Sequence, residues 1–121
     1  MLPIALVALG GALGAVARYL VGSVLNRGAW PVGTLVINAS GCFLIALFLT
    51  LACERAPWLT GGWRYFFPIG FVGAYTTFST YEYELWRMWS LGEIAAAFGY
   101  FTASNVLGFG GIMLGAWVAR R

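Results

Sequence analysis

The chain has 121 residues, of which 61% are hydrophobic and only 9% are charged, and its mean hydropathy is +0.83. A chain of this size cannot hide so much apolar surface in a soluble core, so the composition excludes an ordinary soluble domain and indicates a membrane protein. The formal net charge of +3 includes no lysine and is spread thinly along the chain, which excludes nucleic acid as a partner and favours anchoring at a lipid bilayer.

A helix that crosses a bilayer needs about 20 mainly apolar residues, and four segments reach this length. The predicted spans are residues 2–25, 32–53, 63–88 and 94–119. The first contains a single charge, Arg18, placed where a long side chain can reach the headgroups. Turn residues, glycine and proline fill the connections. We therefore predict an all-α membrane protein with one four-span domain, residues 1–121.

Four crossings place both ends of the chain on one side of the membrane, so the arginines can be counted by side. One side receives Arg55, Arg64, Arg120 and Arg121, and the other receives Arg18, Arg27 and Arg87. This near balance gives almost no orientation signal, which would allow two oppositely inserted copies to pair about a two-fold axis in the membrane plane. A single orientation set by Arg120 and Arg121 is the alternative.

The side chains that catalysis needs are scarce. The chain has no His, Asp or Lys and only four Glu residues. A catalytic triad, a His-based metal site or a Lys Schiff base therefore cannot be assembled, and we predict that the protein is not an enzyme.

Glycines and amides mark contacts between helices. Gly10 with Gly14, and Gly111 with Gly115, have the spacing that lets helix backbones approach closely in lipid. Asn38 lies deep in the second span, where an unpaired amide costs free energy, so its polar groups must form hydrogen bonds. An interhelical hydrogen bond and a role in a transport pathway explain this residue equally well. In the fourth span Tyr100, Ser104 and Asn105 form a polar track or simply hold helices together.

The third span contains an unusual stretch, residues 70–81, which reads GFVGAYTTFSTY. Glycines and clustered threonines loosen a helix, so we predict a break between Gly73 and Thr77. Carbonyls at such a break lose their N–H partners and become ligands for a hard cation. Phe78 and Tyr81 lie three residues apart, so their positive ring edges could contact a small anion together, although either ring alone would suit ordinary packing.

Three stretches of the chain carry a family resemblance. They are Gly10-Gly11 with Gly14-Ala15 and Arg18-Tyr19; Gly33-Thr34-Leu35 with Asn38 and Gly41; and Gly70 and Gly73 with Thr76-Thr77-Phe78-Ser79-Thr80. Together they resemble the CrcB/Fluc fluoride channels over nearly the whole chain. The third stretch is the specific one, because a string of hydroxyls and aromatics inside a four-span chain is not a general membrane pattern.

The resemblance implies a passive fluoride-selective channel of the inner (plasma) membrane that exports cytoplasmic fluoride as an antiparallel, dual-topology homodimer. It implies two fluoride pathways per dimer and a structural sodium ion (Na+) at the subunit interface, held by the backbone carbonyls of Gly73 and Thr76. The pathway residues that it implies are Asn38, Thr77, Phe78, Ser79, Thr80, Tyr81, Glu84, Tyr100 and Ser104. It also places Arg18 toward an aqueous vestibule.

The chain departs from the family pattern at two positions, because Tyr81 replaces a second phenylalanine and Glu82 replaces a common serine, while Glu84 keeps the expected acid. The Tyr81 hydroxyl could bond the anion or a neighbour, and Glu82 could pair with an arginine at the interface.

Two other functions are open. The first is a small multidrug-type proton-coupled exporter, but such exporters share a carboxylate in the first span, and this chain has none there. The second is a non-transporting scaffold subunit of a larger membrane complex, which would leave the hydroxyl-rich break unexplained.

Overall fold

The computed structural model describes residues 1–28 and 30–121; Ala29, in the predicted first connection, lies outside them. Most of the described residues are helical and none of them lies in a strand, which confirms the all-α class. Three helices are long and apolar enough to cross a membrane: α1 (Leu2–Leu25), α2 (Val32–Glu54) and α5 (Ile94–Arg120). That these form one four-span domain with the third segment remains a prediction.

The third segment is divided into pieces. After a short 3₁₀ turn, η1 (Pro57–Thr60), it consists of the π-helical η2 (Tyr65–Val72), the short α3 (Gly73–Tyr75) and α4 (Phe78–Ser90). Pro68 lies inside η2; it has no N–H to donate and its ring clashes with the carbonyl four residues back in an α-helix, so regular α-helical bonding is interrupted here.

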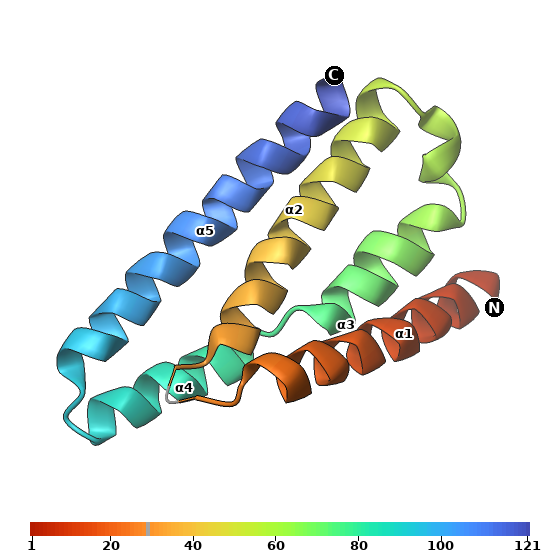
Figure 1. Ribbon diagram of the computed structural model, residues 1–121. Helices are drawn as coiled ribbons and strands as arrows, with labels where there is room; N and C mark the ends of the chain where they lie inside the picture. The colour runs from red at the N-terminus through yellow and green to blue at the C-terminus, as the bar shows by residue number, and fades with distance from the viewer. Residues whose placement is uncertain (29) are drawn as a thin grey trace.

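Two pairs of elements pack most extensively, α2 with α5 and α1 with η2. Figure 1 shows α2 and α5 running side by side and α1 running beside α3. Glycines allow both approaches. A Cβ on Gly10 would collide with the carbonyl of Phe66, and a Cβ on Gly115 would collide with the carbonyl of Phe43. The predicted close-packing role of these glycines is therefore confirmed.

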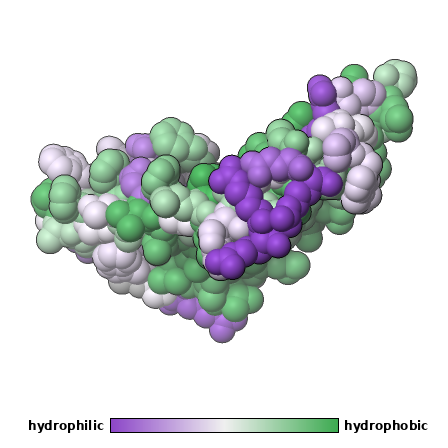
Figure 2. Space-filling model, turned by 90° about the horizontal axis from the view of Figure 1, so that it is seen from above, coloured by the Kyte–Doolittle hydropathy of each residue, from purple (hydrophilic) through white to green (hydrophobic). Residues whose placement is uncertain are grey.

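Both chain ends lie toward the same end of the bundle. In Figure 1 the C-terminus lies at the top, the N-terminus at the right and the turn containing η1 between them, whereas the α1–α2 and α4–α5 connections lie at the lower left. Glu54 and Arg120 form an exposed ion pair at 2.8 Å between the ends of α2 and α5. Figure 2 shows hydrophobic residues over much of the face seen from above, with the hydrophilic residues gathered in patches.

Candidate functional site

The third segment uncoils at Thr76 and Thr77, where the backbone is extended (Thr76 ψ 158°; Thr77 φ −149°, ψ 111°). The N–H of Thr77 donates to Oδ1 of Asn38 at 2.8 Å rather than to the carbonyl four residues back, which is that of Gly73. The N–H of Thr80 likewise donates to the Thr77 hydroxyl at 3.3 Å rather than to the carbonyl of Thr76. The predicted break is confirmed, and the Gly73 and Thr76 carbonyls lose their usual helical donors.

These two carbonyls are neutral, hard oxygen donors, the kind that hard cations take as ligands. Gly73 is exposed and Thr76 is half-buried, so the segment that carries them lies at the surface of the helix bundle. Within the described residues, no group of three or more His, Cys, Asp or Glu side chains offers another metal site. The chemistry of this donor set therefore fits a sodium ion bound by backbone carbonyls.

One face of α2 is turned toward the third segment. Thr34, Asn38 and Gly41 follow one another at intervals of four and three residues, which places them on the same side of a helix. The Thr34 hydroxyl donates to Oε1 of Glu84 at 2.8 Å, and Oδ1 of Asn38 accepts from the N–H of Thr77 at the break. At Gly41 there is no room for a Cβ, because it would overlap the side chain of Thr76. This face of α2 thus holds the break and α4 in place.

A groove of about 380 Å³ lies beside the break, between α2, the third segment and α5. The predicted pathway residues that line it are Asn38, Thr77, Phe78, Tyr81 and Ser104. The Oγ of Ser104 is buried and has no hydrogen-bond partner among the residues that the structure describes. A buried hydroxyl in this condition is available to a polar ligand in the groove.

The predicted aromatic pair meets in this groove, but its two members differ in burial. The ring centroids of Phe78 and Tyr81 are 6.1 Å apart and the rings are tilted by 46°. Tyr81 is 7% exposed and its ring meets the ring of Tyr100 edge-on at 5.3 Å, whereas Phe78 is 74% exposed. Tyr81 is therefore held within the helix bundle, and Phe78 faces outward from it.

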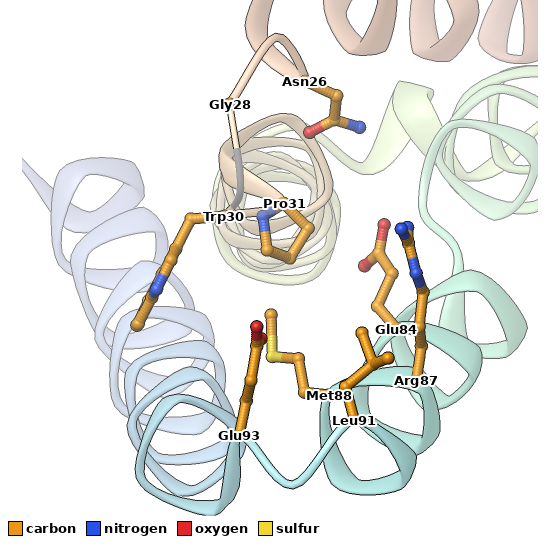
Figure 3. A pocket seen from close by; sticks show the side chains of 9 residues that line it. All are labelled: Asn26, Gly28, Trp30, Pro31, Glu84, Arg87, Met88, Leu91 and Glu93. Atoms are coloured by element: carbon orange, nitrogen blue, oxygen red, sulfur yellow. The ribbon is translucent and has the colours of Figure 1, made fainter.

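Tyr100 and Glu84 link the groove to a second hollow. The fully buried Tyr100 donates its hydroxyl proton to Oε2 of Glu84 at 2.7 Å. Glu84 in turn lines a pocket of about 310 Å³ at the end of the bundle, together with Trp30 and Arg87. In Figure 3 Glu84 and Arg87 extend from α4 toward this pocket, and Trp30 lies across it beside α5. Contacts from Tyr81 to Tyr100 to Glu84 thus form a continuous series between the two hollows.

Four of the predicted pathway and vestibule residues line neither hollow: Ser79, Thr80, Tyr100 and Arg18. Ser79 and Thr80 are exposed on α4, and the Thr80 hydroxyl accepts a bond from that of Thr77 at 2.9 Å. Arg18 is half-buried on α1. The pathway roles of Ser79 and Thr80 and the vestibule role of Arg18 remain predictions.

The sequence analysis did not predict that Thr34 bonds Glu84 or that Arg87 lines the second pocket, and it predicted no specific hydrogen-bond partner for Asn105. Thr34 could have been found, because it lies one helical turn before Asn38 on the same face. The contact of Asn105 with Tyr81, at 3.4 Å, joins positions 24 residues apart and leaves no local signal.

The chain matches a known protein family along most of its length. The model of the family described as CrcB-like protein, Camphor Resistance (CrcB), covers residues 5–116. A protein named fluoride-specific ion channel FluC from Acidobacterium capsulatum is 48% identical over 95% of this chain and 94% of its own. Proteins of the same name from Solibacter usitatus and Caulobacter sp. are 41% and 40% identical, and cover 96% and 100% of this chain and 97% of their own length. The relatives are named as channels and not as enzymes, in agreement with the expectation from composition.

Proposed function

The chain belongs to the CrcB family, and on this basis we propose that it is a passive, fluoride-selective ion channel of the inner (plasma) membrane. Its physiological role is to release cytoplasmic fluoride that entered the cell as the neutral acid. Relatives that are 40–48% identical over nearly their full length carry the name of this activity.

The groups along the groove suit this anion. Fluoride is small and strongly hydrated, so a pathway must offer several donors at close range, yet none may bind the ion too tightly to let it leave. The amide of Asn38, the hydroxyl of Ser104 and the ring edges of Phe78 and Tyr81 are all neutral and line one groove. A buried lysine or arginine would bind the anion too firmly, and none lines this groove.

The working unit that we propose is an antiparallel homodimer with two fluoride pathways and a structural sodium ion at the interface. Four closely packed helices fill their own centre and leave little lumen, so pathways belong between subunits. The exposed position of Gly73, whose carbonyl has lost its helical donor, supports this, because such a backbone group needs a partner at membrane depth. The near balance of arginines permits the two orientations.

The observation that carries the proposal is the uncoiled turn at Thr76 and Thr77 beside a groove of neutral donors, in a chain of this family. The test is to reconstitute the purified protein in liposomes loaded with fluoride and to follow efflux down the gradient, with chloride-loaded liposomes as the control. We expect rapid loss of fluoride and retention of chloride. Retention of both ions, or equal loss of both, would rule out a fluoride-selective channel.

A further inference from the structure

The amide of Asn105 has only one possible orientation. Its Nδ2 donates to the carbonyl of Phe101 at 2.8 Å, and a carbonyl can only accept, so the nitrogen and not the oxygen must lie on this side. The same Nδ2 donates its other hydrogen to Oη of Tyr81 at 3.4 Å. Both hydrogens of the amide are thereby committed, one to α5 itself and one to the tyrosine on α4.

This orientation determines where the Tyr81 proton points. A phenol oxygen that accepts from an N–H cannot direct its own proton at that nitrogen, so the O–H of Tyr81 is turned away from Asn105. No described residue accepts this proton. Tyr81 and Asn105 both line the groove beside the break, together with the unpartnered hydroxyl of Ser104. The Tyr81 ring cannot swing away easily, because it is 7% exposed and packed edge-on against Tyr100.

We infer that the Tyr81 hydroxyl is a hydrogen-bond donor to the anion in this groove, and that Asn105 is a positioning residue that keeps the donor aimed at it. The inference rests on the proposed fluoride channel and adds a specific polar contact to the ring-edge contact expected at this position. A charge-assisted O–H bond to a small anion is directional and strong. This bond therefore raises the occupancy of the groove by fluoride at low fluoride concentration and has little effect on the maximal efflux rate.

The experiment compares initial fluoride efflux at a low and at a saturating fluoride concentration. Tyr81→Phe keeps the ring and removes only the hydroxyl, so the fold is preserved. We expect the rate at low fluoride to fall about tenfold, as for the loss of one hydrogen bond to a charged group, while the saturated rate is nearly unchanged. Asn105→Leu should lower the low-fluoride rate in the same way. The double variant should behave like Tyr81→Phe alone, because Asn105 acts through Tyr81.

Tyr83→Phe is the matched control, since Tyr83 is 61% exposed on the same helix and lies outside the lining of the groove; its rates should equal those of the wild type. Unchanged low-fluoride efflux in Tyr81→Phe would overturn the inference while the channel function stands. Equal loss at both concentrations in Asn105→Leu, or full additivity in the double variant, would overturn the positioning role. A wild-type protein that releases no fluoride would instead refute the proposed function, and this inference with it.

Discussion

The side-chain amide of Asn38 pairs with both polar groups of the Thr77 backbone, accepting from its N–H at 2.8 Å and donating to its carbonyl at 3.1 Å. A primary amide has the same donor and acceptor pair as a peptide unit, so α2 satisfies the uncoiled turn as a neighbouring strand would. Non-helical backbone at membrane depth is tolerated only where such partners exist. One N–H of Asn38 finds no acceptor in the described residues and remains free for a ligand in the groove.

Replacing Asn38 with leucine should destabilise the turn, because it leaves both polar groups of Thr77 without a partner. An unsatisfied buried backbone group costs about 1–3 kcal/mol, so we expect a loss of about 2 kcal/mol or more in the free energy of unfolding, together with loss of fluoride flux. Reversible unfolding in mixed micelles and liposome efflux measure the two effects. Ser23→Ala is the control, since the Ser23 hydroxyl bonds only its own helix at Leu20. An Asn38→Leu protein of wild-type stability would show that the turn does not depend on this amide.

Gly41 should tolerate no side chain, because a Cβ there would overlap the side chain of Thr76. We expect Gly41→Ala to displace the turn and to lower the free energy of unfolding by about 1–3 kcal/mol, the usual cost of overpacking. Gly110→Ala is a matched control, since a Cβ on Gly110 meets nothing within 4 Å. Thermal unfolding of the two variants side by side provides the measurement, and equal midpoints would contradict the close contact.

The break could be predicted from the sequence, whereas the partners that hold it could not. Hydropathy predicted a fourth span beginning at residue 94, where α5 begins, and the glycines and threonines located the uncoiled turn between Gly73 and Thr77. By contrast, Glu84 binds the hydroxyls of Thr34 and Tyr100, which are 50 and 16 residues away. The hydrophobic periodicity of one helix shows which of its faces is apolar, but it does not identify the residues of other helices that contact that face.

The π-helical form of η2 also escaped prediction. Pro68 suggests a disturbed helix, but a proline is equally compatible with a kink or a broken turn. In the structure η2 packs closely against α1, where Gly14 lies directly against the carbonyl of Phe71. Contacts of this kind between α1 and η2 depend on the assembled bundle.

Removal of sodium should weaken the assembly if the Gly73 and Thr76 carbonyls hold the ion between two subunits. Without the cation these oxygens would face one another with their helical donors missing, which costs free energy in a dry interface. We expect prolonged exchange into a large organic cation to lower the thermal midpoint and the dimer fraction, and readdition of sodium to restore both. Light scattering with size-exclusion chromatography measures the dimer. A dimer equally stable after complete exchange would exclude a structural sodium ion.

Phe78→Ile should reduce fluoride flux while the dimer persists. The Phe78 ring is 74% exposed in the subunit, so its loss removes little packing within the fold, and isoleucine preserves an apolar surface at this position. What isoleucine lacks is the positive ring edge that an anion can contact. Efflux from liposomes should therefore fall well below the wild-type rate, with an unchanged elution volume. Phe98→Ile provides the comparison, because Phe98 is 71% exposed on α5 but lies outside the groove. If both variants conducted like the wild type, Phe78 would not belong to the pathway, and the ring-edge contact would have to be assigned to Tyr81 alone.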